Sequence, residues 1–493
     1  MKRFEEVFLD RAELMKYQLY ERLSEFHVAN LSVTDLAGML NWKYQATYNV
    51  LAEVVDDLCE SCHLSTQTVR HQIMNPAQMP MSLEAYRSKL AQASLSYQLI
   101  DYAFQGPNPT TEEFLMLTHV SSSTLIRYRK KINLFLVAYG IQIKGSHLQL
   151  SGSEATWRYF LFLFYWWAHR GTVWPLRFVD VASIVSQVAK IRLFAVNDQL
   201  NRYQTLFWGI CHVRLGQGHM VASQPDLDAF AVRLSQLIPQ HSLTAARIPA
   251  LSVAFFNFFE ISRPCFEHGV QADHQYQLEL QLMQNPIIDA VVNAVVASLQ
   301  ASPSQALKID SNMRMNFART VLGFAIFEGK MPLISDAITG SQSRVYVQEC
   351  YDTCLKALQL LPDRPEYNCF QIGAEPLAQQ IARFMTPLPL VKPEATACLV
   401  ELCVNPLASG YRKLLSFLSA IPEQAIIVKR QGDLVICEAE ISWSETAVAH
   451  PERQFEWYAD ALDEPIYRRA LARKLQTINR QKMTGIFHLR SPA

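Results

Sequence analysis

The sequence predicts a multidomain, mainly α-helical protein with two N-terminal helix-turn-helix domains, two all-α helical bundles and a small C-terminal α/β domain. Three observations support this fold class. A chain of 493 residues is long enough for about three to five domains. A helix-turn-helix pattern occurs twice before residue 150, and long amphipathic helical patterns fill residues 166–390. Strand and helix patterns then alternate in the last hundred residues.

The composition is that of a folded protein, because half of the residues are hydrophobic and the formal net charge is zero. The N-terminus carries mixed charges where a signal peptide needs an apolar core, so we expect a cytoplasmic chain. The most hydrophobic run, residues 159–168, is too short to span a bilayer, which needs about 20 residues. We therefore expect no membrane contact and a wholly buried helix that joins two domains.

The residues give no sign of a metal, a cofactor or an active site. Cys59 and Cys62 form the one close cysteine pair, and no second pair completes a four-ligand zinc site. Together with His63 the pair matches a haem-attachment pattern, which we interpret as chance at the end of a predicted helix. Residues 166–390 contain no phosphate-binding loop, HExxH motif, nucleophile elbow or carboxylate pair. We expect that the protein is not an enzyme.

Residues 111–150 predict a winged helix-turn-helix. Six positions of its interface are apolar or tolerate burial: Phe114, Leu115, Thr118, Val120, Leu125 and Tyr128. Ser121 and the two serines after it offer hydroxyls that cap the second helix, where a phosphate can also be held. Alternating runs at 141–144 and 148–150, around Gly145 and Ser146, then predict a hairpin. A helix-turn-helix followed by a hairpin is typical of a DNA-binding winged helix.

The second helix of this unit is basic, and no acidic residue follows its cations before Tyr139. The residues expected to contact DNA are Ser122, Ser123, Thr124, Arg127, Tyr128, Arg129, Lys130 and Lys131 on the helix, with Lys144 and His147 on the wing. A solvated basic helix beside an ordinary hairpin would show the same pattern. A second copy of the motif favours DNA binding.

Residues 31–51 form that second copy, with Ser32 or Thr34 as the helix cap. Its interface positions are Leu36, Ala37, Leu40, Trp42, Thr47 and Val50. Residues 1–75 hold seven Lys and Arg against eleven Asp and Glu, a net charge of −4, whereas residues 76–165 hold eight against five, a net charge of +3. Phosphate contacts dominate affinity, so the second unit should supply more of it. The first unit either contacts DNA or mainly packs against its neighbour. Its candidate contacts are Lys43, Tyr44, Gln45 and Tyr48.

The rest of the chain divides into two helical bundles and one α/β domain. Helices are expected at 178–194, 198–215, 226–237, 276–299, 311–328 and 345–361, with a break between the bundles near 275–285. The final part predicts strands at 397–404, 425–428 and 434–437, and helices at 410–418 and 465–479. That order indicates a sheet with at least some parallel strands. The basic residues of the closing helix are interpreted as a solvated face.

This arrangement resembles the Mga/AtxA family of regulators from Gram-positive bacteria. The most specific resemblance lies in residues 121–160, with serines before the second helix, the wing, Gly152-x-Glu154, and Arg158 before an aromatic helix. The resemblance implies five domains: helix-turn-helix domains at 1–75 and 76–165, phosphotransferase-system regulation domains (PRD) at 166–282 and 283–390, and an enzyme-IIB-like domain at 391–493.

The resemblance also implies a function. It predicts a transcription regulator, expected to be an activator, that binds double-stranded DNA as a homodimer with the C-terminal domain contributing to the dimer. A histidine of the first regulation domain would accept phosphate from the sugar phosphotransferase system: His219 is the first candidate and His212 the second. The second regulation domain has no histidine. In the C-terminal domain Cys403 lies inside a predicted strand and no cysteine begins the following loop, so we expect a structural domain.

Two other functions stay open at this point. An RNA-binding antiterminator shares regulation domains, but the helical pattern of residues 1–75 disfavours its small β domain. A phosphotransferase-linked sensor that acts by protein contact would need neither helix-turn-helix unit.

Overall fold

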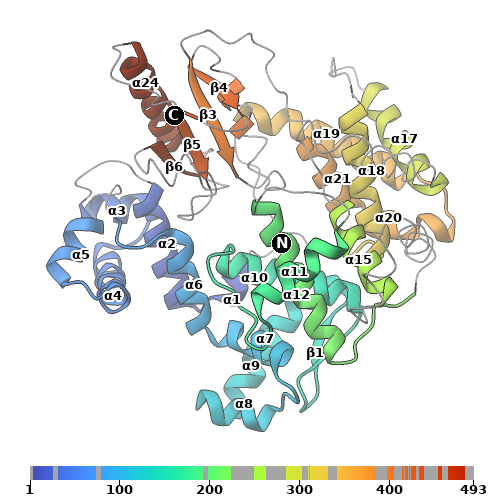
Figure 1. Cartoon of the computed structure of the whole chain (residues 1–493), viewed down its shortest axis with the longest axis horizontal. Coiled ribbons are helices and arrows are strands. Elements are labelled where there is room, and N and C mark those ends of the chain that lie inside the picture. Colours follow the sequence, from blue (N-terminus) through green and yellow to red (C-terminus); the bar gives the residue numbers. More distant parts are fainter. Residues whose placement is uncertain are drawn as a thin grey trace.

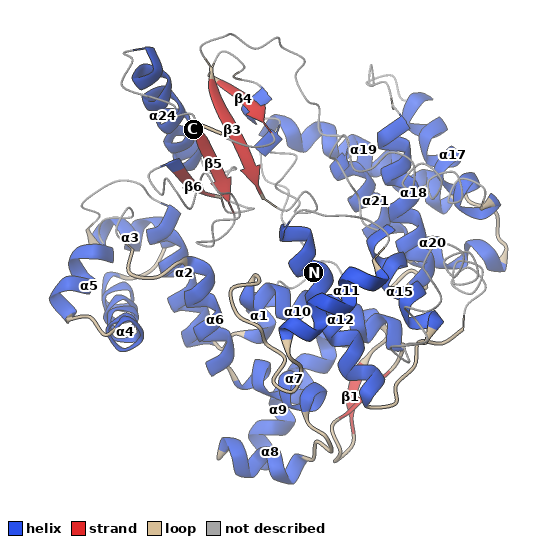
Figure 2. Ribbon diagram, viewed as in Figure 1, coloured by secondary structure: helices blue, strands red, loops and turns tan. Residues whose placement is uncertain are grey.

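The computed structural model describes the greater part of the chain. The described residues are 4–25, 32–73, 79–192, 198–223, 249–261, 285–301, 309, 311–330, 341–384, 397–404, 414–415, 417–419, 421, 424–428, 432–437, 453–457 and 465–483. Figure 2 shows that this part is mainly helical, with strands in two places. One is a small hairpin and the other a C-terminal sheet.

The first helix-turn-helix forms where the sequence predicts it. The N-terminal helices are α1 (Phe4–Phe8), α2 (Arg11–Glu25), α3 (Val33–Leu40), α4 (Tyr44–Cys62) and α5 (Thr66–Ile73). Ser32 begins α3 with a capping box. Its side chain accepts a hydrogen bond from the Asp35 backbone amide, and the Asp35 carboxylate accepts one from the Ser32 backbone amide. The predicted interface residues of α3 and α4 are buried or half-buried.

The second unit is the predicted helix-turn-helix with its wing. Its elements are α6 (Leu83–Ala93), α7 (Leu95–Gln105), α8 (Thr111–Thr118), α9 (Ser122–Leu136), η2 (Val137–Tyr139), β1 (Gln142–Lys144) and β2 (Gln149–Ser151). The two strands are antiparallel, with Ile143 opposite Leu150. Both of these side chains face the core, which is the alternation expected of a hairpin with one buried face.

Helix α10 (Glu154–His169) lies between the second unit and the helical modules (Figure 1). Every side chain from Ala155 to His169 is buried. It packs against α6 on one side and α12 on another, so the aromatic run is a buried joining helix, as predicted. No helix among the described residues has the length and hydropathy needed to cross a bilayer.

The helical modules follow α10 along the chain. Their described helices are α11 (Val181–Ile191), α12 (Asp198–Gly216), α15 (Ala250–Ile261), α17 (Pro286–Ala301), α18 (Ser311–Ile326), α19 (Ser341–Gln359), η3 (Pro365–Tyr367), α20 (Asn368–Ile372) and α21 (Ala374–Phe384). Five of the six predicted helices overlap these elements. The sixth, at 226–237, lies outside the described residues, as do 193–194 and 276–284.

The helical part has one continuous core rather than separate ones. A single cluster of buried hydrophobic residues extends from Phe4 to Ala382. Tyr159 of α10 stacks on Phe327 at 4.9 Å between ring centroids, and Phe162 meets Phe207 of α12 at 5.8 Å. Helix α10 therefore packs against both modules.

The C-terminal part is an α/β unit with its own core. Its described elements are β3 (Cys398–Cys403), β4 (Ala425–Val428), β5 (Leu434–Cys437), β6 (Gln454–Glu456) and α24 (Pro465–Met483). The strand order is β4-β3-β5-β6 and every pair is parallel, which confirms the expected parallel pairing. The three-residue strand β6 was not predicted from the sequence. Of the predicted helix at 410–418, residues 410–413 and 416 lie outside the described part, as does Asn405.

Candidate nucleic-acid interface

The two helices of the second unit meet at a tight turn. Thr110 caps α8 and Ser121 caps α9, each by accepting a hydrogen bond from the amide three residues later. His119 ends α8 in the left-handed conformation, with φ 54°. Phe114 and Leu125 are buried across the helix interface. The other predicted interface residues, Leu115, Thr118, Val120 and Tyr128, are half-buried.

The first unit repeats this turn. Asn41 ends α3 with φ 54°, the value that His119 adopts after α8. A three-residue turn precedes α4 as it precedes α9. The two sequence copies are thus two copies of one local structure.

The outward face of α9 carries four of the eight helix residues expected to contact DNA, which are Ser122, Ser123, Arg127 and Lys130. Its exposed side chains are Ser122, Ser123, Ile126, Arg127, Lys130 and Leu134. Their spacing of three or four residues places them on one side of the helix. On the opposite side, Leu125, Ile132, Phe135 and Leu136 are buried. The helix therefore presents two cations, two hydroxyls and two aliphatic side chains to its surroundings.

The other cations of α9 have partners within the protein. Arg129 is half-buried and its Nη1 donates to the Gly145 carbonyl oxygen at 2.9 Å. Lys131 is also half-buried and its Nζ donates to the Leu9 carbonyl oxygen at 3.3 Å. These two side chains join α9 to the wing and to the N-terminal segment.

Tyr128 contacts the exposed Arg127 and Asp10 of the N-terminal segment. The Arg127 guanidinium lies over its ring, 5.6 Å from the centroid. Desolvation, with a hydrogen bond to Asp10, raises the pKa of Tyr128 to about 12. The phenol therefore stays protonated at neutral pH and holds the Arg127 side chain against α9.

The wing is fixed to α9 by a pair of hydrogen bonds. The Asn133 side-chain Nδ2 donates to the Ile143 carbonyl oxygen at 2.9 Å, and the Ile143 backbone amide donates to Asn133 Oδ1 at 2.8 Å. At the tip, the Thr111 amide donates to the Ser146 carbonyl oxygen at 2.6 Å. Lys144 and His147 are exposed on this braced hairpin. Helix α9 and the wing therefore form one rigid surface.

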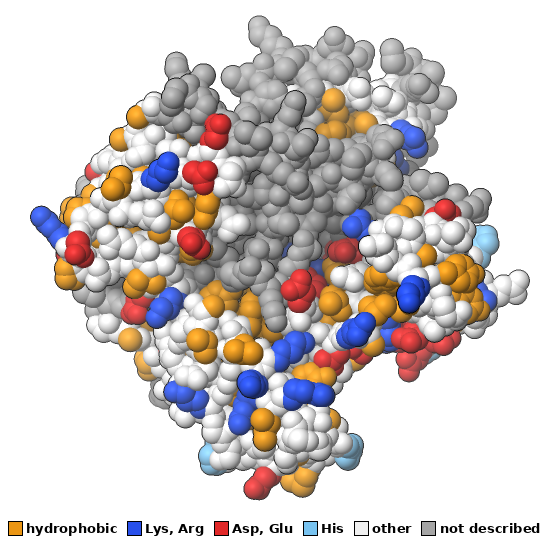
Figure 3. All heavy atoms as spheres, turned by 180° about the vertical axis from the view of Figure 1, so that it is seen from behind, with side chains coloured by type: hydrophobic (Ala, Val, Ile, Leu, Met, Phe, Trp, Pro, Cys, Tyr) orange, Lys and Arg blue, Asp and Glu red, His pale blue; other side chains and the backbone are white. Residues whose placement is uncertain are grey.

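Lys and Arg side chains gather on one part of the molecular surface. Viewed from behind, several of them lie together in the lower part of the molecule (Figure 3). Helices α8 and α9 lie in this lower part in Figure 1. The formal charge of zero thus hides an uneven distribution.

The candidate residues of the first unit are also on the surface. Lys43, Tyr44, Gln45 and Tyr48 are all exposed at the start of α4, and the Gln45 side chain donates to Asn49 at 2.9 Å. Lys43 precedes α4 without a side-chain cap.

Asp57 joins this first unit to the second. Its carboxylate accepts from Lys16 Nζ at 3.0 Å and from the Tyr86 hydroxyl at 2.8 Å. Lys89 Nζ donates to its carbonyl oxygen at 2.8 Å. Burial, and then the Asp57 charge, raises the pKa of Tyr86, so the phenol remains a donor. Helix α4 is thereby anchored on α6 beside α2.

The cysteine pair has ordinary partners. Both thiols are half-buried, and Cys62 Sγ lies 3.4 Å from the Pro80 carbonyl oxygen. The described residues include no group of His, Cys, Asp and Glu side chains that could hold a metal ion.

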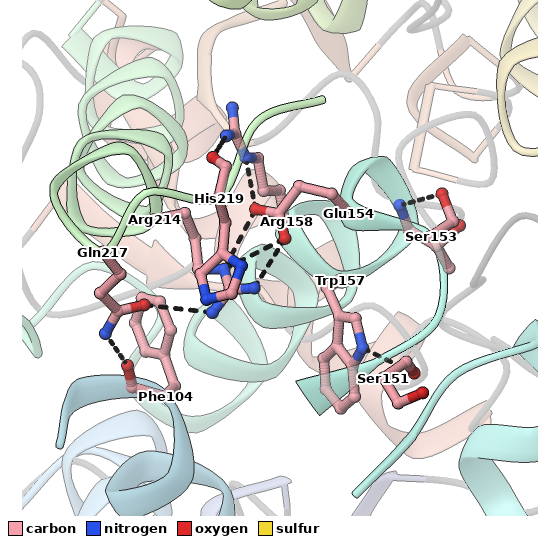
Figure 4. A network of polar contacts seen from close by, with 10 residues as sticks. Phe104, Ser151, Ser153, Glu154, Trp157, Arg158, Arg214, Gln217 and His219 are labelled. Carbon is pink, nitrogen blue, oxygen red and sulfur yellow. Dashed lines mark hydrogen bonds and ion pairs between the residues drawn. The ribbon is translucent and has the colours of Figure 1, made fainter. Parts of the chain in front are cut away.

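The two candidate regulatory histidines lie in α12 and just after its end. His212 is exposed within the helix, and His219 is exposed three residues after the helix ends. Desolvation lowers the pKa of both, and at His219 the neighbouring Arg214 lowers it further. His219 lies beside Glu154, Arg158 and Arg214, which form a polar network between α10 and α12 (Figure 4).

A comparison with protein families identifies the second unit. Residues 80–165 match the family model of the Mga helix-turn-helix domain. The resemblance to the Mga/AtxA family is confirmed in this segment. The Mga-type domain contains α6 to α9, the wing and most of α10. A domain of this kind indicates a DNA-binding transcription regulator. No curated protein matches the chain.

The sequence did not predict the structural roles of three residues of the Mga-type domain. Asn133 binds the wing, Ile126 is exposed beside Arg127, and Glu154 is shared by two arginines. The exposed Ile126 could have been found from helical periodicity, because it follows Ser122 and Ser123 by one turn. The other two depend on contacts between separate elements, which periodicity does not reveal.

Proposed function

We propose that this protein is a transcription regulator, expected to be an activator, that binds duplex DNA through α9 and the wing. The observation that carries the proposal is the outward face of α9 in a domain that matches the Mga helix-turn-helix family. In a helix-turn-helix the N-terminal part of the second helix enters the major groove. Ser122, Ser123, Ile126 and Arg127 occupy that part of α9, and Lys130 follows on the same face.

Each exposed group of α9 has a chemical counterpart on DNA. Arg127 carries a guanidinium that can donate two hydrogen bonds to a guanine edge. Lys130 and the hydroxyls of Ser122 and Ser123 suit phosphate oxygens, as do the first two amides of the helix. The amide of Thr124, the third residue, already donates to Ser121 Oγ. Lys144 and His147 on the wing would contact the backbone beside the groove.

Arg129, Lys131 and Tyr128 are proposed to position this surface. Their hydrogen bonds to Gly145, Leu9 and Asp10 occupy part of their donor capacity within the protein. An arginine that holds the wing still affects DNA binding, because binding needs α9 and the wing in one fixed arrangement.

We propose a secondary contact through Lys43, Tyr44, Gln45 and Tyr48 of the first unit. Support comes from their exposure and from the turn geometry shared with the second unit. The net charge of −4 in residues 1–75 argues for a weaker phosphate contribution there.

The remaining domains are proposed to regulate this binding. Residues 166–282 and 283–390 would be the two PRD-like modules, after helix-turn-helix domains at 1–75 and 76–165. Residues 391–493 would be the enzyme-IIB-like domain and contribute to a homodimer. His219, with His212 as the alternative, would accept a phosphoryl group from the sugar phosphotransferase system. The exposure of both imidazoles is compatible with that reaction.

The test is an electrophoretic shift of a promoter-bearing duplex over a series of salt concentrations. The variant is Arg127→Ala/Lys130→Ala, which spares Arg129 because that side chain also holds the wing. Loss of an arginine that recognises guanine and of one phosphate contact should weaken binding about tenfold or more, and loss of the phosphate contact should reduce the salt slope by about one. The matched control is Lys190→Ala/Lys356→Ala, which removes two exposed cations from α11 and α19.

Unchanged binding by a folded Arg127→Ala/Lys130→Ala variant would contradict the assignment of α9. An equal loss in the control would indicate non-specific charge attraction. A hairpin RNA of similar length is the competitor, and preference for it would favour the antiterminator function. Absence of binding to either nucleic acid would favour a sensor that acts by protein contact.

A further inference from the structure

Glu154 is shared by two arginines from different elements. Its Oε1 accepts from Arg158 Nε at 2.9 Å and from Arg214 Nε at 3.0 Å. Its Oε2 accepts from Arg214 Nη2 at 2.6 Å. Arg158 is one turn further along α10, whereas Arg214 comes from the end of α12. One carboxylate thus joins the winged domain to the first helical module (Figure 4).

Within the described part of the chain, the charges of this cluster are not balanced. The side chains of Arg158, Arg214 and Glu154 are 0%, 4% and 12% exposed, so two buried guanidinium groups share one carboxylate. Arg158 Nη1 has no hydrogen-bond acceptor among the residues that the structure describes. Because charges out of water interact strongly, a cluster with one excess positive charge should respond to a new anion beside it.

His219 lies at the exposed side of the cluster. Arg158 Nη2 donates to its carbonyl oxygen at 2.9 Å, and its own amide donates to the Arg214 carbonyl oxygen at 2.9 Å. After desolvation, Arg214, Glu154 and Arg158 are the groups that influence the pKa of His219. The imidazole is exposed, so a group added to it would meet both the solvent and the two arginines.

The wing lies at the other side of the cluster. Glu154 is the first residue of α10, and Gly152 and Ser153 alone separate it from β2. The Trp157 indole donates to the Ser151 carbonyl oxygen at 3.1 Å, which anchors the end of β2 on α10. A change in the hydrogen bonds between Glu154 and the two arginines therefore acts on the start of α10, to which the wing is attached.

We propose that Glu154 transmits negative charge at His219 to the wing. This inference rests on the proposed function, since it assumes a charge at His219 and a wing that contacts DNA. A dianionic phosphoryl group on His219 would repel Glu154 and offer Arg214 a second acceptor. The ion pair between Glu154 and Arg214 then weakens. As a result the start of α10 is less firmly held and the wing becomes less ordered. Duplex affinity falls as a result.

The group transfer itself is simple. The donor is a phosphohistidine of a phosphotransferase protein. The unprotonated ring nitrogen of His219 forms an N–P bond, and the donor nitrogen takes back the electron pair of the N–P bond that breaks. No further reactant is needed.

The experiment uses the full chain and a matched pair, His219→Glu and His219→Gln, which differ in charge and hardly in shape. Two quantities are measured: amide hydrogen exchange of residues 142–157 without DNA, and the dissociation constant for the duplex. We expect faster exchange in His219→Glu than in His219→Gln and at least about fivefold weaker duplex binding. In a Glu154→Gln background the two variants should be alike.

Two controls accompany the test. The variants His212→Glu and His212→Gln place the same charge difference within α12. Neither Arg158 nor Arg214 contributes to the pKa shift of His212, so amide hydrogen exchange of residues 142–157 should be the same in these two variants. If Glu154→Gln fails to fold, Glu154→Asp keeps the carboxylate and should retain the difference between His219→Glu and His219→Gln.

Three results would overturn parts of this account. Equal exchange in His219→Glu and His219→Gln would exclude the transmission. A difference that persists in the Glu154→Gln background would assign it to another route. Failure of the wild-type chain to bind duplex DNA would overturn the proposed function, while the exchange measurement would still decide the role of Glu154.

Discussion

Arg129 donates a hydrogen bond from Nη1 to the Gly145 carbonyl oxygen at 2.9 Å, and so connects the middle of α9 to the turn of the wing. The two residues are sixteen positions apart in the chain. A cation predicted from the sequence as a DNA contact thus also organises the surface on which the other cations lie.

Arg129→Ala should loosen the wing while the domain stays folded. Because Arg129 is half-exposed, the free energy of unfolding should fall by less than about 1 kcal/mol. Amide exchange should rise in the wing, and Arg129→Lys should restore part of the protection. Faster exchange throughout the domain, rather than in residues 142–151, would contradict this role.

Ile126→Ala should reduce a preference for thymine. Ile126 is 57% exposed next to Arg127, and the major groove presents the thymine methyl group as an apolar contact. Replacing thymine by uracil, base by base, should weaken wild-type binding by about fourfold at one position, which corresponds to burial of one methyl group. The Ile126→Ala variant should bind both duplexes alike, and it should fold as stably as the wild type because Ala favours a helix. Equal uracil sensitivity in the two proteins would rule out the contact.

Gly152→Ala should destabilise the joint between wing and α10. Gly152 has φ +121°, and a Cβ there would lie 2.5 Å from the Gly140 carbonyl oxygen. We expect a loss of about 2 kcal/mol or more in chemical denaturation. Gly38→Ala is the matched control, since a Cβ at Gly38 meets nothing within 4 Å inside α3, and it should stabilise by about 0.5–1 kcal/mol. A Gly152→Ala protein of wild-type stability would show that the backbone can relax here.

His169 should make stability depend on pH. It is buried between the Ser88 hydroxyl at 2.8 Å and the Tyr97 hydroxyl at 2.7 Å, and desolvation, with the charge of Arg87, lowers its pKa to about 4. The unfolded value is about 6.5, so between these two pH values the unfolded chain binds a proton that the folded chain does not. The contribution of His169 to the free energy of unfolding should therefore be fully present above pH ~6.5 and fall by about 3 kcal/mol as pH decreases towards ~4.

Urea denaturation of wild type and His169→Gln at several pH values would measure this contribution as the difference between the two curves. The difference should change across that pH range and be constant above it. A constant difference throughout would mean that His169 titrates normally in the folded protein.

Local patterns determined much of the secondary structure. The positions of α3, α4, α8, α9 and the wing followed from helical periodicity, serine caps and strand alternation, because these signals depend on near neighbours in the chain. The resemblance in residues 121–160 likewise pointed to the domain that the family match confirms. Exposure of Arg127 and Lys130 agrees with a basic outward face on α9.

Contacts between distant segments decided the rest. Helical periodicity separates the exposed Arg127 from Arg129, which follows the buried Leu125 by one turn, but no local signal predicts the hydrogen bond between Arg129 and Gly145. Glu154, Arg158, Arg214 and His219 are well separated in the sequence, and packing of α10 on α12 brings them together. The physical reason is that the energy of a buried charge depends on which partners the fold places around it, and in this cluster the partners are as many as 61 positions away in the chain. The sequence by itself determined the elements and the kind of domain, and the tertiary structure decided which of their side chains act together.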